Sequence, residues 1–119
     1  MNLNLKGHSS YVTSFCQLDY NLLASSSVDH TVIIWDLGLG SLKYTLKGHS
    51  KSVTSLARLD NYLLGSGSDD ANVQIWNFST GQLKYILNKH TYSVTSLAYL
   101  GNNILASGSQ DDTIIVWKT

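Results

Sequence analysis

The feature that most constrains this chain is a repeat of 41 residues that runs through its length. Ten positions of a 28-residue window carry the same residue in all three copies, with no insertion or deletion between the copies. Each window opens on a histidine and closes on a tryptophan: His8 to Trp35, His49 to Trp76 and His90 to Trp117. A fixed period of about 20–50 residues indicates a small structural unit stacked on copies of itself.

Each copy is built from short segments with the composition of β-strands. In the middle copy these segments are SVTSLARL, LLGSGS, NVQIW and QLKYIL, separated by turns rich in Asn, Asp, Gly and Ser. No segment keeps apolar residues at helical spacing over the length of a helix. The chain has no proline, which suits strands that donate every ladder hydrogen bond. The sequence therefore predicts one antiparallel four-stranded sheet per complete copy.

Composition excludes several classes of function. The 119 residues form one region, and eight basic and eight acidic residues give a formal net charge of zero. That balance argues against binding to nucleic acid, which needs an excess of basic charge. No apolar run approaches the roughly 20 residues that span a bilayer, so we expect no membrane association. The first residues do not resemble a signal peptide, and Cys16 is the only cysteine; together these favour the cytoplasm or nucleus.

The middle copy contains the motifs of a known family. Gly48-His49, Val53-Thr54-Ser55, Leu64 to Ser68, Asp70 and Ile75-Trp76 closely resemble the WD40 repeat, and the first copy closes with Trp35-Asp36, the WD dipeptide itself. The third copy departs from the motif, because Lys89-His90 stands where the others have Gly-His. The resemblance implies an all-β fold of three antiparallel WD40 blades, an incomplete β-propeller as a single chain. It also implies a non-catalytic protein–protein interaction scaffold.

The repeat divides the region 1–119 into units. Residues 1–5 are expected to be the fourth strand of a preceding blade, followed by blade 1 (6–46), blade 2 (47–87) and blade 3 (88–119), which lacks its own fourth strand. Because each blade needs neighbours on both faces, three blades are expected to be part of a ring. Two chains would give six blades and three chains nine. The alternative is that the chain is a fragment whose blades complete a larger ring of a longer WD40 protein in a purely structural role.

Each copy also contains a His, a Ser and an Asp, the residue types of a hydrolase triad. An active site is normally single, whereas this set occurs three times, each with a tryptophan six residues after the aspartate. The family resemblance implies structural hydrogen-bonded tetrads instead, and hydrolase activity is the remote alternative. The tetrads are His8, Ser25, Asp29 and Trp35; His49, Ser66, Asp70 and Trp76; and His90, Ser107, Asp111 and Trp117. The sequence indicates no catalytic residue, no metal site and no cofactor.

The resemblance also places partner-binding positions on the loops. They lie just before the first strand (Tyr11, Ser52, Ser93), just after the histidine (Ser9, Ser50, Thr91) and just before the turn aspartate (Val28, Asp69, Gln110). These positions differ between copies while the framework does not, as expected of residues that face solvent or a partner. Tyr11 is the best single candidate, because exposed tyrosine is enriched at interface hot spots. The partner is predicted to be another protein or a peptide of unknown identity.

Overall fold

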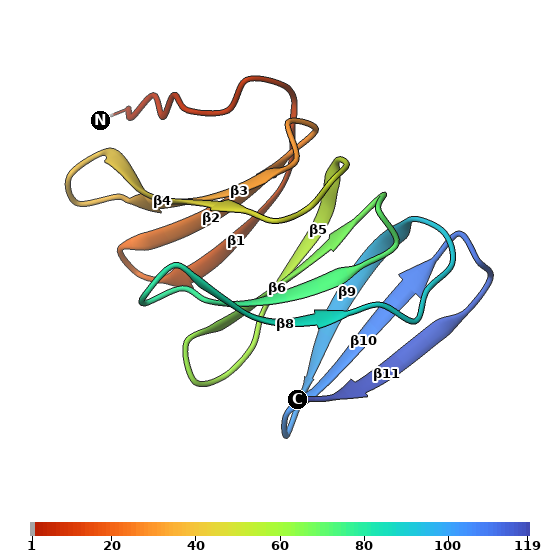
Figure 1. Ribbon diagram of the computed structural model, residues 1–119. Coiled ribbons are helices and arrows are strands. Elements are labelled where there is room, and N and C mark those ends of the chain that lie inside the picture. Colours follow the sequence, from red (N-terminus) through yellow and green to blue (C-terminus); the bar gives the residue numbers. More distant parts are fainter. Residues whose placement is uncertain (1) are drawn as a thin grey trace.

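Three antiparallel β-sheets stand side by side in the computed structural model, which describes residues 2–119 (Figure 1). The first sheet contains β1 (Val12–Asp19), β2 (Leu22–Ser27), β3 (Thr31–Asp36) and β4 (Ser41–Lys47). The second contains β5 (Val53–Arg58), β6 (Leu63–Ser68), β7 (Val73–Asn77) and β8 (Gln82–Leu87). The third contains β9 (Val94–Gly101), β10 (Ile104–Ser109) and β11 (Ile114–Lys118). The predicted all-β class and the incomplete propeller are confirmed.

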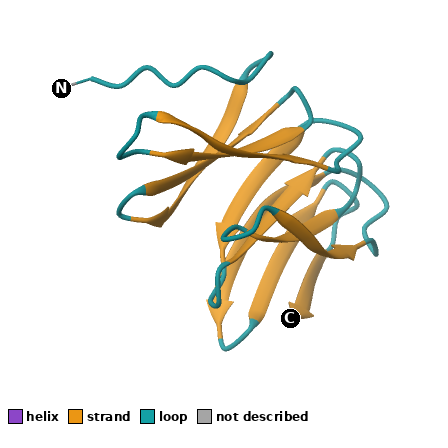
Figure 2. Ribbon diagram, turned by 60° about the vertical axis from the view of Figure 1, so that its left-hand side comes forward, coloured by secondary structure: helices purple, strands orange, loops and turns teal. Residues whose placement is uncertain are grey.

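Within each sheet the strands pair in chain order, so that each sheet is a simple meander. The sheets come closest at their first strands, since β1 lies beside β5 and β5 beside β9. The last strands β4, β8 and β11 lie farther apart than the first strands do (Figure 1), and Figure 2 shows the same three sheets from another side. This arrangement brings the loops before the first strands and the turns between second and third strands to one common edge.

Two apolar cores hold the sheets together. The core between the first and second sheets contains Leu18, Ala24, Val32, Ile34, Leu46, Val53, Leu64, Trp76 and Phe78. The core between the second and third contains Ala57, Leu59, Leu63, Val73, Ile75, Val94, Leu105 and Trp117. The middle sheet is therefore covered on both faces, and each outer sheet on one.

The segment before β1 is not part of any sheet. Residues 2–11 form no strand, and the part of the predicted strand 1–5 that the structure describes pairs with no other segment of residues 2–119. Met1 lies outside the described residues. Residues 1–5 were predicted to be the fourth strand of a blade outside this chain of three sheets, and this stays a prediction. The described part of the chain contains no helix long and apolar enough to cross a membrane.

One buried side chain departs from the pattern of its own repeat. Gln74 on β7 is 2% exposed, and its Oε1 atom has no hydrogen-bond partner among the described residues. The first copy has Ile33 at this position, 1% exposed, and the third has Ile115. An unpartnered buried carbonyl loses its hydrogen bonds to water without replacement. Gln74 therefore weakens the sheet that contains it.

We expect Gln74→Ile to stabilise the protein. The substitution removes the unpartnered acceptor and introduces a β-branched residue suited to a strand, a gain of about 1–3 kcal/mol in the free energy of unfolding. Urea denaturation of both variants measures the difference. Gln82→Ile on the exposed end of β8 is the matched control, because it changes strand propensity without removing a buried polar atom. An equal gain in both variants would contradict the explanation.

Candidate functional site

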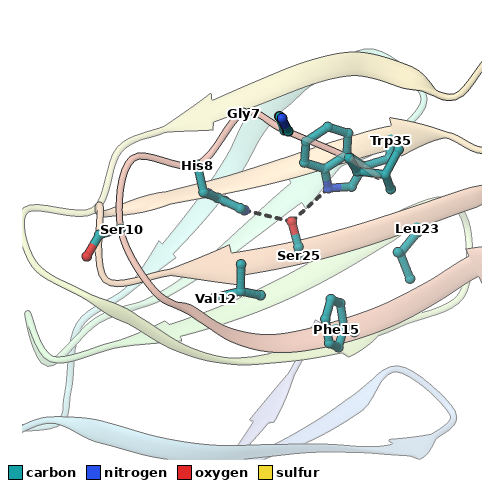
Figure 3. Close-up of a pocket in the computed structure, with 10 residues that line it drawn as sticks. Gly7, His8, Ser10, Val12, Phe15, Leu23, Ser25 and Trp35 are labelled. Atoms are coloured by element: carbon teal, nitrogen blue, oxygen red, sulfur yellow. Dashed lines mark hydrogen bonds between the residues drawn. The ribbon is translucent and has the colours of Figure 1, made fainter. Parts of the chain in front are cut away.

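The first sheet contains a chain of four hydrogen-bonded side chains. The Nδ1 atom of His8 lies 3.0 Å from Asp29 Oδ2, and its Nε2 atom lies 2.7 Å from Ser25 Oγ. The indole of Trp35 donates its Nε1–H to the same Ser25 oxygen over 2.8 Å. Figure 3 shows the serine between the imidazole and the indole. The structure thus brings together the four residues that the sequence grouped.

The other two sheets repeat this chain with nearly the same geometry. The His–Asp, His–Ser and Trp–Ser distances are 2.8, 2.7 and 2.9 Å in the second sheet and 2.9, 2.7 and 2.8 Å in the third. The third copy keeps this geometry although Lys89 replaces the glycine before its histidine. Lys89 is exposed. Its side chain therefore leaves the network unchanged.

The elements of each sheet position the four groups. In the second sheet Ser66 lies on β6 and Trp76 on the neighbouring β7, while Asp70 lies in the turn between these strands. The Asp70 carboxylate accepts the backbone N–H of Asn72 at 2.9 Å, which closes the turn, and that of Ser50 at 3.0 Å, which fixes the loop after His49. The network therefore runs from the buried indole to the surface loop.

Another invariant serine ties the same loop to the same turn, and the sequence had assigned it no role. The Ser68 hydroxyl donates to the Ser52 carbonyl at 2.7 Å and accepts the backbone N–H of Asp70 at 3.1 Å. In the other sheets the hydroxyls of Ser27 and Ser109 donate one residue earlier in the loop, to the carbonyls of Ser10 and Tyr92, and accept the backbone N–H of the turn aspartate as Ser68 does. Identity in all three copies was the signal that could have marked them as part of the network.

The carboxylates of the network are held in the ionised form. Burial raises the pKa of Asp29, but hydrogen bonds from the Thr31 hydroxyl, from the backbone N–H groups of Ser9 and Thr31 and from His8 outweigh it and lower the pKa to about 2. The same balance lowers the pKa of Asp70, with the backbone N–H of Asn72 as the largest lowering contribution. For Asp111 the hydroxyl of Thr113 is the main cause of a pKa well below the usual value.

The histidine of the middle network is held neutral. Burial lowers the pKa of His49 below its usual value of 6.5, although the hydrogen bond and charge of Asp70 oppose this effect. A neutral imidazole donates from Nδ1 to the carboxylate and accepts the serine hydroxyl at Nε2. The serine oxygen is then free to accept the indole N–H. Every polar side-chain group of this network has a partner in this arrangement.

The Asp–His–Ser order is that of a hydrolase triad, but the serine is differently placed. The three serines Ser25, Ser66 and Ser107 are 2, 0 and 1% exposed. Each hydroxyl oxygen is also occupied by an indole N–H. A nucleophile must reach its substrate, and these hydroxyls lie under the sheet surface. Among residues 2–119 no group of three or more His, Cys, Asp or Glu side chains is placed to hold a metal ion.

The nine predicted partner-binding positions lie at the edge where the networks end, which we call the rim. The rim comprises Ser9, Tyr11, Val28, Ser50, Ser52, Asp69, Thr91, Ser93 and Gln110; all are exposed except Ser52 and Ser93, which are half-buried. In each sheet the residue before the turn aspartate donates its backbone N–H to the residue before the first strand, over 2.9 Å. The rim backbone is therefore fixed while its side chains remain accessible.

Comparison with known proteins identifies the repeat. The family described as WD domain, G-beta repeat matches the chain three times, over residues 2–36, 40–77 and 81–118. Each match contains one complete network of His, Ser, Asp and Trp. A search of curated proteins found no match to the chain.

We expect Ser66→Ala to destabilise the fold. The substitution leaves the indole N–H of Trp76 and the Nε2 atom of His49 without their shared partner, at a cost of about 1–3 kcal/mol. Chemical denaturation measures the loss, with Ser50→Ala as the control, because only the backbone N–H of Ser50 enters the network. A stability equal to that of the control would contradict a structural role for the tetrad.

We expect acid to weaken the fold in two stages. The folded-state pKa of His49 lies below its usual 6.5, so the unfolded chain takes up this proton first and stability falls as the pH drops below about 6.5. The folded-state pKa of Asp29 is about 2, so a second loss follows between about pH 4 and pH 2, when unfolded carboxylates protonate first. Both contributions are fully present at neutral pH. Thermal unfolding across this range at constant ionic strength tests the sign; a midpoint that rises on acidification would refute it.

Proposed function

The chain belongs to the WD40-repeat family, and we propose that it is a non-catalytic scaffold that binds another protein or a peptide at the rim. WD40 repeats generally mediate protein–protein interaction. Two features of the network serines support a role without catalysis: all three are almost fully buried, and each hydroxyl oxygen accepts an indole N–H.

The observation that carries this proposal is the contrast between a constant frame and variable rim side chains. The network residues are identical in all three copies, whereas the rim differs: Ser9, Tyr11 and Val28 in the first sheet, Ser50, Ser52 and Asp69 in the second, and Thr91, Ser93 and Gln110 in the third. A rigid backbone loses little conformational entropy when a partner binds. The variable side chains are then free to determine which partner is recognised.

The rim also contains suitable contact groups. Tyr11 is 82% exposed and Tyr92, beside Thr91, is 65% exposed. Tyrosine offers a large apolar ring and a polar hydroxyl with few rotatable bonds, and for this reason it is frequent at interface hot spots. Lys51 lies between Ser50 and Ser52 and is exposed. A partner segment with both apolar and hydrogen-bonding groups fits this surface.

The alternative is that these blades only complete a larger ring whose binding surface lies on other blades. In that case the rim side chains of this chain contribute nothing to recognition. The two proposals differ in what a rim substitution does to partner binding, and not in what it does to folding.

We expect Tyr11→Ala to weaken capture of a specific partner at least tenfold, because truncation of a hot-spot tyrosine costs about 2 kcal/mol or more. Affinity capture with the intact chain as bait, followed by quantitative mass spectrometry, measures the ratio for each protein retained. Tyr20→Ala is the matched control, because Tyr20 is 90% exposed in the turn after β1, at the far end of that strand from the rim. Asp69→Ala and Gln110→Ala extend the test to the other sheets. Undiminished capture by all three rim variants would favour the purely structural alternative.

A further inference from the structure

Both outer faces of the three-sheet stack carry exposed apolar side chains. On the first sheet, Phe15 is 67% and Val12 46% exposed. On the third sheet, Ile114 is 76% and Val116 58% exposed. Contiguous exposed apolar surface of this kind is typical of an interaction site.

These two faces match the two halves of an interface that the chain already makes twice. On the middle sheet, Val53 stands one repeat after Val12 and is 0% exposed, because the first sheet covers it. On the first sheet, Val32 and Ile34 stand two repeats before Ile114 and Val116, and both are 0% exposed under the second sheet. The equivalents of Val12, Ile114 and Val116 are therefore buried where a neighbouring sheet is present, and Leu56, the equivalent of Phe15, packs half-buried against the core.

A hydrogen bond between neighbouring sheets also recurs with the repeat. The Thr13 hydroxyl donates to the Val53 carbonyl of the next sheet at 2.6 Å. The Thr54 hydroxyl donates in the same way to the Val94 carbonyl of the third sheet. Thr95 is the third residue of this series, and among residues 2–119 its hydroxyl contacts only the Gly108 carbonyl, at 3.4 Å. It lacks the partner that a following sheet would supply.

The outer face of the first sheet has a cavity. The cavity measures about 370 Å³, and Leu5 is among the residues that line it. Figure 3 shows the apolar lining residues Val12, Phe15, Leu23 and Trp35, together with His8 and Ser25 of the network. The corresponding space beside Leu64 and Trp76 of the second sheet is filled by side chains of the first sheet, Val32 and Ile34 among them. The cavity thus occupies, on the first sheet, the place that the inter-sheet core occupies on the second.

We propose that the third sheet of one copy docks on the first sheet of a second copy, head to tail, as consecutive sheets pack within the chain. Ile114 and Val116 of one copy then cover Val12 and Phe15 of the other and fill its cavity. The Thr95 hydroxyl donates to the Val12 carbonyl across this interface. The occupant is a second copy of the chain because the first sheet of that copy carries Val12, Leu23 and Trp35. These residues are the repeat equivalents of Val53, Leu64 and Trp76, the part of the second sheet that the first sheet covers.

The equivalence of residues in the repeat also predicts how the segment before β1 of one copy pairs with β11 of another. Within the first sheet, Val32 pairs with Leu46 and Ile34 with Tyr44. Moved along by the repeat, these pairs become Ile114 with Leu5 and Val116 with Leu3 of the second copy. Leu3 is 51% exposed, and β11 has no fourth strand beside it in the described residues. Residues 2–5 of the second copy therefore extend the third sheet at its open edge, where unpaired backbone groups favour strand addition.

This inference does not rest on the rim and is tested separately from the proposed function. Light scattering coupled to size exclusion at micromolar concentration is expected to give two or three times the monomer mass of 13.1 kDa. Ile114→Glu with Val116→Glu is expected to convert the assembly to monomer, because two charges would be buried unpaired. Both residues are already exposed in the single chain, so the variant keeps its fold. Ile86→Glu, at a residue 52% exposed on β8 of the middle sheet, is the matched control and should leave the mass unchanged. A monomeric wild-type chain, or an assembly that persists in the double variant, would overturn the proposal.

Disulfide trapping tests the register. Paired residues on adjacent antiparallel strands lie about 4.5–5.5 Å apart between Cα atoms, within the range that a disulfide needs. In a Cys16→Ala background, Leu3→Cys with Val116→Cys should form a covalent link between chains on mild oxidation. Leu3→Cys with Ile115→Cys is the control, because Ile115 points to the opposite face of β11. Equal yields from the two pairs, or no link from the first, would refute the register.

Discussion

Packing between consecutive sheets is the interaction on which the rest of this structure depends. Each sheet has apolar side chains on both faces, and a sheet of this kind is stable in water only when neighbours cover it. The middle sheet shows the completed state, in which Val53, Leu64, Val73 and Ile75 are all 0% exposed. The orientation that buries these side chains also brings the first strands together and gathers the loops into one rim.

The tetrads transmit that rigidity from the core to the surface. Trp76 is 2% exposed and packs against the first sheet, while its N–H group enters the chain of hydrogen bonds. This series of hydrogen bonds ends at Asp70, whose carboxylate accepts the backbone N–H of Ser50 at the surface. A charged group at this place is stable because N–H donors of His49, Ser50 and Asn72 compensate its burial. The backbone of the rim is thus fixed by the network residues that lie beneath it.

Much of the fold could be predicted from the sequence, because alternation and turn chemistry are local properties. The segment NVQIW was predicted as a strand, and β7 spans Val73–Asn77. The grouping of His, Ser, Asp and Trp also followed from their constant spacing, and the structure brings these groups within hydrogen-bonding distance in all three copies. The role of Ser68 was missed although its position is invariant, because a hydroxyl that binds backbone atoms has no distinctive spacing. The unpartnered Gln74 was missed as well, since glutamine is usually exposed.

By itself, therefore, the sequence determined the repeat, the strands, the four-residue sets and the variable positions, since each follows from spacing along the chain. Only the tertiary structure decided which face of a sheet meets which neighbour. The bond from Thr13 to Val53 and that from the Arg58 Nε atom to the Leu18 carbonyl join residues 40 apart. A repeat of 41 residues shows which positions are equivalent, but it does not show that these residues touch. Phe15 and Leu56 occupy the same place in their repeats, yet Phe15 is 67% exposed while Leu56 packs against the core. Burial depends on what lies opposite a residue, and that depends on how the sheets are stacked.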